Sequence, residues 1–145
     1  EFQPARTRCR PCCYSGSWVF ARAAAVSDDC GPAYTPQTTS LANSTLQIHA
    51  TTNGADILGA SWSVWTDCTY ELYLDELGVH LNDSSWSCQD TTKDPAAYWE
   101  VYSFEVVTSN GLTAIHDAQY QRDYFYADGT TLTCYQTVHA VMNRR

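Results

Sequence analysis

Positive charge is scarce in this chain. It holds one lysine, Lys93, and its arginines gather toward the two ends of the sequence, where they include Arg144 and Arg145. Between residues 11 and 143, three basic residues stand against fifteen carboxylates. With a net charge of −8, such a body repels phosphate backbones, so we expect no nucleic-acid partner. We interpret the basic ends as solvated tails.

Long apolar runs and helical periodicity are also missing. No stretch approaches the length of a membrane span, so we expect none. After residue 44 the apolar residues alternate with the period of two that half-buried strands require. This pattern predicts strands at 44–50, 59–66, 69–74 and 77–81, with another at Trp18-Val19-Phe20 and a polar loop over 82–96.

Two turn signals predict hairpins in the C-terminal third. Asp128-Gly129 suits a two-residue turn of type I′, which would place Phe125 opposite Leu132 on an inner face with Cys134. The same register would gather Tyr120, Tyr124, Tyr126 and Tyr135 on the other face.

The second turn signal is Asn110-Gly111. A two-residue turn there puts Val106 opposite Ile115 and Glu105 opposite His116.

These strands predict an all-β protein. Eight or so strands in meander order must close or stack to protect their edges. We therefore predict a single small antiparallel β-barrel over residues 17–145, with a β-sandwich as the alternative and Trp62, Trp65, Trp86 and Trp99 as its filling. Residues 1–16 form a cysteine-rich N-terminal arm, whose first two residues, Glu1-Phe2, are typical of a cloning scar.

Seven cysteines leave at least one without a partner in the chain. The C-x-x-C of Cys9 and Cys12 suggests zinc or redox chemistry, but no second pair completes a zinc site, and we expect no metal and no cofactor. We predict instead that Cys9, Cys12 and Cys13 tie the arm to the barrel, with their pairing left open. An unpaired thiol leaves a monomer and a disulfide-linked dimer as alternatives.

Four of the cysteines lie in the predicted barrel itself. Cys68 and Cys88 flank the hairpin at 69–81, and we predict that they pair. Cys134 either pairs with Cys30 or stays a buried thiol. Together with glycosylation sequons at Asn43 and Asn82, these cysteines indicate a secreted, extracellular protein.

The predicted Glu105–His116 pair is the one catalytic hypothesis that the sequence supports. A carboxylate that orients an imidazole is used for general acid–base chemistry in hydrolases and nucleases. Arg122 is the basic residue of the nearby strands that could hold a phosphate. An ordinary cross-strand ion pair explains the same pattern more simply, so we assign no catalytic residue.

The four tyrosines of the last hairpin suggest a different activity. Exposed aromatic rows can stack on sugar rings, which makes a carbohydrate-binding module the second hypothesis. The same tyrosines could equally face the core.

The acidic, cysteine-bearing, β-rich body, with "WSC" at 86–88 and Cys134 in the final strand pair, resembles small secreted fungal proteins. It is similar in type to elicitors of the hypersensitive response in plants, such as those of the rice-blast fungus, and to the β-barrel major allergen of Alternaria. The resemblance extends loosely over residues 14–143, and the extra N-terminal cysteines depart from the allergen's pattern. It implies a non-enzymatic virulence effector or elicitor that meets a host plant surface protein or glycan.

Overall fold

The computed structural model describes residues 11–52, 57–62, 69–82, 86–92 and 94–145. Within them, one short helix precedes a series of strands. These elements are α2 (Pro11–Tyr14), β1 (Gly16–Phe20), β2 (Ala25–Asp29), β3 (Gln37–Ser40), β4 (Thr45–Ala50), β5 (Ile57–Trp62), β6 (Thr69–Asp75), β7 (Gly78–Leu81), β8 (Trp86–Asp90), β9 (Ala96–Thr108), β10 (Thr113–Phe125) and β11 (Thr131–Arg144).

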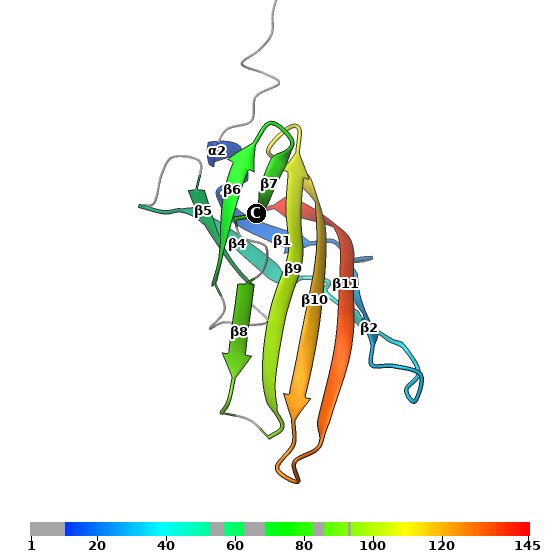
Figure 1. The fold of residues 1–145 in the computed structure, drawn as a ribbon. Helices are drawn as coiled ribbons and strands as arrows, with labels where there is room; N and C mark the ends of the chain where they lie inside the picture. The colour runs from blue at the N-terminus through cyan, green and yellow to red at the C-terminus, as the bar shows by residue number, and fades with distance from the viewer. Residues whose placement is uncertain (1–10, 53–56, 63–68, 83–85, 93) are drawn as a thin grey trace, which may run out of the picture.

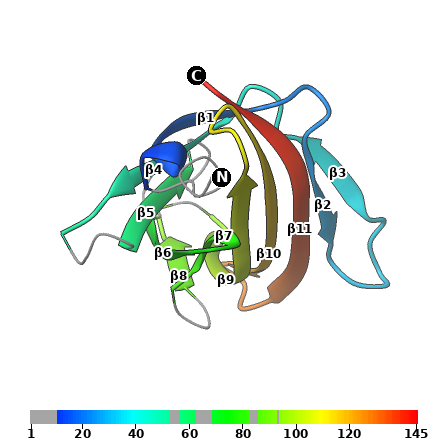
Figure 2. The same ribbon diagram turned by 90° about the horizontal axis from the view of Figure 1, so that it is seen from above.

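Among the described residues, eight strands close into an antiparallel β-barrel. Their order is β1-β4-β5-β6-β7-β9-β10-β11, and β11 returns to pair with β1 through Trp18 and Arg144. Figure 2 shows this ring of strands from above. The predicted β-barrel is therefore confirmed, and the sandwich alternative is wrong. Closure removes the free edges that the separate strands would expose.

The long strands β9, β10 and β11 extend beyond the barrel. Strand β8 pairs with the first part of β9, and β2 pairs with β11 and carries β3 at its outer edge. Figure 1 shows that the far ends of β9, β10 and β11 reach past the ring of short strands. The molecule therefore has a barrel and, continuous with it, a curved sheet.

Apolar side chains fill the barrel interior. The even-numbered residues from Ala114 to Tyr120 on β10 and from Cys134 to Met142 on β11 are buried, as the period of two requires. The largest fully buried side chains are Trp18, Tyr120, Phe20, Leu46, Ile48, Leu58, Leu72, Met142, His116, Val79 and Val101. Of the tryptophans expected inside, Trp99 is buried, Trp65 lies outside the described residues, and the side chains of Trp62 and Trp86 do too.

The hairpin around Asp128-Gly129 differs from its predicted register by one residue. Tyr124, not Phe125, lies opposite Leu132. The Asp128 carboxylate accepts hydrogen bonds from the amide and hydroxyl of Thr130, at 2.9 and 2.6 Å, and the loop is longer than two residues. Because successive side chains of a strand point to opposite faces, a slip of one residue changes which side chains of the two strands share a face. Phe125 consequently lies exposed, and its predicted inner position is wrong.

The hairpin around Asn110-Gly111 slips in the same way. Val106 pairs with His116 instead of Ile115, and Glu105 pairs with Asp117. Asn110 Oδ1 accepts hydrogen bonds from the amides of Leu112 and Thr113, which again lengthens the turn.

Most of the short strands lie where the alternation placed them. Strands β1, β4, β6 and β7 match their predicted segments closely, and β5 begins two residues earlier than expected. Residues 63–66, the predicted end of that strand, lie outside the described residues. The predicted loop at 82–96 is wrong over Trp86–Asp90, which form β8 on the edge of β9.

Arg144 fastens residues 11–16 to the barrel, which corrects its interpretation as part of a solvated tail. Its guanidinium donates hydrogen bonds to the carbonyl oxygens of Cys13, Ser15 and Gly111 and lies 4.6 Å from the Trp18 ring centroid. Gly16 has a φ of +128°, and a Cβ there would meet Nη1 of Arg144 at 2.6 Å. A glycine is therefore required beside the guanidinium.

Tyr14 completes this attachment. Its side chain is 3% exposed and packs in the core, and its carbonyl accepts a 2.7 Å hydrogen bond from Trp18 Nε1. Residues 14–16, assigned to the arm from the sequence, thus belong to the barrel. Whether Cys9 or Cys12 also tethers the arm by a disulfide lies outside what the structure describes.

Candidate functional site

A β-bulge in β9 creates a pocket on the outer wall of the barrel. Ser103 pairs with Gln119 and Val101 with Tyr120, so Tyr102 is the extra residue of the bulge. Strand β9 pairs with β7 at Glu105 and Val106 and with β8 at 97–101, and the pocket lies by the interval between them. Its volume is about 350 Å³, and it is lined by His80, Leu81, Tyr102, Ser103, Phe104, Glu105 and Asp117. Bulges commonly redirect side chains beside functional sites.

His80 is held between two carboxylates at the edge of this pocket. Its Nε2 lies 3.0 Å from Asp75 Oδ1, and its Nδ1 lies 3.2 Å from Glu105 Oε2. Each ring nitrogen of His80 thus faces one carboxylate oxygen, which accepts a hydrogen bond from that nitrogen when it carries a proton. The His80 side chain is 17% exposed, whereas both carboxylates lie more open to solvent.

Asp75 is further fixed by the turn between β6 and β7. Its Oδ1 accepts hydrogen bonds from the amides of Leu77 and Gly78 at 2.7 and 3.1 Å. Burial alone would raise the pKa of Asp75, but these amides and His80 together lower it below its ordinary value. The carboxylate therefore stays ionised beside the imidazole.

The polar row continues across the next two strands. Asp117 on β10 lies directly opposite Glu105 on β9. On its other side it lies opposite His139 on β11, and its carboxylate is hydrogen-bonded to Nδ1 of that ring. The resulting order across the outer wall is Asp75, His80, Glu105, Asp117, His139. Acids and imidazoles thus alternate except at the Glu105–Asp117 contact, which joins two like charges.

The catalytic hypothesis on Glu105 and His116 is wrong. Because of the register slip, the Glu105 carboxylate points outward toward His80, while His116 is fully buried. The His116 Nδ1 lies 2.9 Å from the backbone oxygen of Glu105, and its ring packs 4.5 Å from that of Phe104. Burial lowers the pKa of His116 to about 4, so the ring is neutral at pH 7. A neutral imidazole in a filled interior has no access to substrate.

The predicted tyrosine face does not exist as one surface. Tyr120 is 1% exposed in the core, and Tyr124 lies on the same inward side, half-buried under Arg122. Tyr126 lies in the loop after β10, and Tyr135 is exposed on the opposite side of the sheet. The one-residue slip of the hairpin places Tyr135 on the face opposite Tyr120 and Tyr124, and the longer turn removes Tyr126 from the strand.

A different set of side chains meets on the outer wall, and we name it the aromatic–amide face. It comprises Tyr98, Glu100, Tyr102, Gln121, Asp123 and Tyr135. Tyr98 pairs with Asp123 across β9 and β10, and Gln121 pairs with both Glu100 and Tyr135. Tyr102 belongs both to this face and to the bulge pocket. Only Tyr135 is shared with the predicted tyrosine face.

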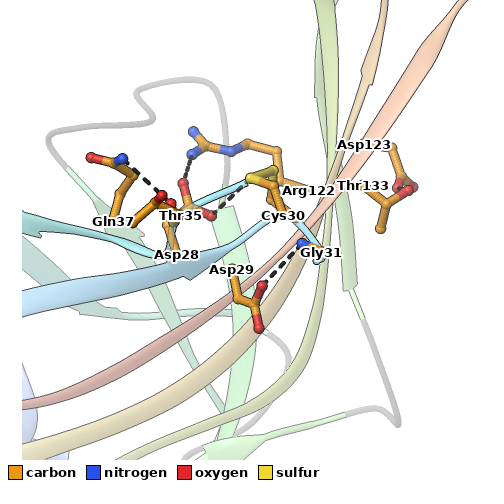
Figure 3. The surroundings of a disulfide bond; sticks show 10 residues. Asp28, Asp29, Cys30, Gly31, Thr35, Gln37, Arg122, Asp123 and Thr133 are labelled. Atoms are coloured by element: carbon orange, nitrogen blue, oxygen red, sulfur yellow. Dashed lines mark hydrogen bonds and ion pairs between the residues drawn. A yellow bond between two sulfur atoms is a disulfide. The ribbon is translucent and has the colours of Figure 1, made fainter. Parts of the chain in front are cut away.

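On the inner side of the extended sheet, a disulfide joins Cys30 to Cys134. This is the first of the two alternatives considered for Cys134. Figure 3 shows Arg122 reaching Asp28 beside the sulfur atoms, and the two charged groups lie 3.2 Å apart. Asp28 and the two sulfurs lie within 4.8 Å of one another. The sulfurs are bonded to each other and cannot act as thiolate ligands, so this group is a structural anchor.

Of the remaining cysteines, the structure describes the bonding state of Cys13 and Cys88. Cys13 carries a free, half-buried thiol. Cys88 is disulfide-bonded, but Cys68 lies outside the described residues, so their pairing stays a prediction. The sequon asparagines Asn43 and Asn82 are both exposed.

His80 is the site residue that sequence reasoning missed. It lies in the four-residue strand β7, which pairs with β9 although β8 comes between these two strands in the sequence. No local pattern specifies that non-local pairing. The available signal was the alternation of "GVHL", which turns His80 to the side opposite Val79 and Leu81 directly after the Asp75 turn.

Comparisons with protein families, with curated proteins and with solved structures found no match for this chain. Among the described residues, no helix has the length and apolar character needed to cross a membrane.

Proposed function

We propose that this protein is a secreted, non-enzymatic elicitor or effector that acts on a host plant by surface recognition. The observation that carries the proposal is the filled barrel. Trp18, Phe20 and Tyr120 are among the side chains that occupy its interior, so recognition is left to the outer wall. The Cys30–Cys134 disulfide and the exposed sequons support secretion, and the resemblance to fungal elicitors supports a plant host.

The outer wall supports recognition in a second way. It carries exposed aromatic side chains on the long strands β9, β10 and β11, and the row of paired acids and imidazoles runs from β6 and β7 across these three strands. Side chains on such strands are held more rigidly than side chains on loops, which favours specific binding. The Glu105–His116 hydrolase is not proposed, because its two groups lie on opposite sides of the sheet.

Infiltration of the pure protein into leaves tests the proposal. Wild-type protein is expected to induce local cell death or defence-gene expression. Met142→Asp, which places a charge in the core, is expected to unfold the barrel and abolish the response. Val141→Asp is the matched control. Val141 is the residue next to Met142, but its side chain is 45% exposed on the outer wall, so a charge there is expected to leave the barrel folded.

Two outcomes would contradict the proposal. Leaves that do not respond to the wild-type protein would remove the elicitor function. An undiminished response to unfolded Met142→Asp would show that a linear peptide suffices, and recognition of a folded surface would then be wrong.

A further inference from the structure

We propose that the aromatic–amide face binds a neutral oligosaccharide. The inference concerns a binding site and goes beyond the elicitor function, which it does not require. The face runs over β9, β10 and β11 and adjoins the bulge pocket through Tyr102. An extended sugar chain lying on the face therefore has a pocket at one side into which a residue of that chain can enter.

Three tyrosines give the face its aromatic platforms. Tyr135 is 59% exposed, Tyr102 44% and Tyr98 37%. Phe125 supports Tyr98 with an edge-on contact at 5.0 Å between the ring centroids. Aromatic rings combine a large apolar surface with defined geometry, and tyrosine adds a hydroxyl that can bond a polar ligand. The C–H faces of pyranose rings fit such platforms.

Between the aromatic rings runs a network of planar polar groups. The Tyr102 hydroxyl lies 3.0 Å from Glu100 Oε1 and 2.8 Å from Gln121 Oε1. Gln121 Nε2 donates to the Asp123 carboxylate at 3.2 Å, and Thr133 Oγ1 donates to the same carboxylate at 2.6 Å. These bonds hold the side chains in place before a ligand arrives, which reduces the entropy lost on binding.

The network is rich in acceptors, and a sugar supplies the donors. An ionised carboxylate has about four lone-pair sites, and the bonds from Tyr102 to Glu100 and from Gln121 and Thr133 to Asp123 use only some of them. Hydroxyl groups of a sugar can donate to the others. Burial, and then the hydrogen bond to Glu100, raise the pKa of Tyr102 above its ordinary value, so its phenol keeps its proton as a donor.

The charge of the face disfavours an anionic ligand. Glu100 and Asp123 lie on it, Glu105 and Asp117 lie in the adjoining pocket, and the whole chain carries −8. Uronic-acid or sulfated glycans would be repelled. A protein partner is disfavoured because the centres of protein interfaces are depleted of Asp and Glu, whereas here carboxylates lie between the aromatic rings.

Isothermal titration of the pure full-length protein tests the proposal with cellohexaose, laminarihexaose and chitohexaose as neutral probes. Oligogalacturonate and a chitosan hexamer serve as anionic and cationic probes. We expect at least one neutral probe to bind and oligogalacturonate, which the carboxylates repel, to bind more weakly. The chitosan hexamer, which the carboxylates attract, tests whether the ligand is neutral or cationic. Tyr135→Ala and Gln121→Ala are each expected to lower the affinity about tenfold or more.

Val141→Ala is the matched control. Val141 lies on the same strand and the same outer wall as Tyr135 and is also exposed, but it lies outside the aromatic–amide face. Its affinity is expected to equal that of the wild type. Three results would overturn the proposal: no neutral probe binds, a charged probe binds more tightly than every neutral one, or Tyr135→Ala binds as well as Val141→Ala. Because the titration involves no plant, it can fail while the leaf response persists.

Discussion

Arg144 joins three segments that are far apart in the sequence. It bonds the carbonyl oxygens of Cys13 and Ser15 before β1 and of Gly111 in the turn between β9 and β10. Its planar guanidinium also stacks on the buried Trp18 ring. The several fixed donors of arginine suit such convergent carbonyl groups, and the single ammonium group of lysine does not reproduce them.

Arg144→Ala is expected to lower the free energy of unfolding by about 2–4 kcal/mol, because hydrogen bonds to a charged group contribute about 1.5–3 kcal/mol. Arg144→Lys is expected to recover only part of this loss. Urea denaturation measures both. The control is Arg145→Ala, an exposed neighbour expected to change stability by less than about 0.5 kcal/mol. Equal unfolding midpoints for the two alanine variants would contradict this role of Arg144.

Single side chains in the turns also explain how far the sequence could predict this structure. Alternation placed most of the short strands correctly, because each strand buries one side. Asp128 and Asn110, however, use their side chains to cap the loop backbone and lengthen each turn beyond the two residues expected. Each slip of one residue moved side chains to the wrong relative face. The predicted Glu105–His116 pair failed for that reason, and the same kind of slip moved Tyr135 to the face opposite Tyr120 and Tyr124.

At the scale of the elements, β11 is the strand that connects the two parts of the molecule. It pairs with β1 and β10 in the barrel and with β2 in the extended sheet. Cys134 on β11 is bonded to Cys30, which directly follows β2, and the two are 104 residues apart in the sequence. The disulfide thus fixes β2 to β11 where their pairing ends.

Replacing both Cys30 and Cys134 by alanine is expected to lower the free energy of unfolding by about 3–5 kcal/mol, because a loop of this length gains much entropy in the unfolded chain once the bond is absent. The midpoint of guanidinium denaturation measures the loss. Cys13→Ala is the control, since its thiol is free and its replacement removes no cross-link. A double variant as stable as Cys13→Ala would show that strand pairing alone holds β2 in place.

At the scale of the whole molecule, the stability of the barrel depends on keeping His116 neutral. Phe20 and Phe104 pack against its ring, and burial lowers its pKa to about 4. The Glu105 backbone oxygen and the Asp117 charge act in the opposite direction but do not outweigh burial. Between about pH 6.5, the ordinary pKa of histidine, and pH 4, His116 therefore binds a proton in the unfolded chain but not in the folded chain.

The contribution of His116 to stability is complete above pH 6.5 and is lost as the pH falls toward 4. Between pH 7 and pH 5 the free energy of unfolding is expected to fall by about 2 kcal/mol through this residue. In His116→Gln this part of the pH dependence is expected to disappear, whatever the variant's absolute stability. Denaturation curves across this range measure it, with the exposed His49→Gln as control. An unchanged slope in His116→Gln would refute the assignment.

The pairing of β1 with β11 has a consequence for biosynthesis. These are the first and the last strands of the barrel, so ring closure requires Gly16–Phe20 to wait for Thr131–Arg144. A nascent chain halted before β11 leaves β1 and β10 with unpaired edges, and contacts of such long sequence separation form slowly. Closure of the barrel therefore waits until β11 has been synthesised, and until then the edges of β1 and β10 stay open to pairing with other chains.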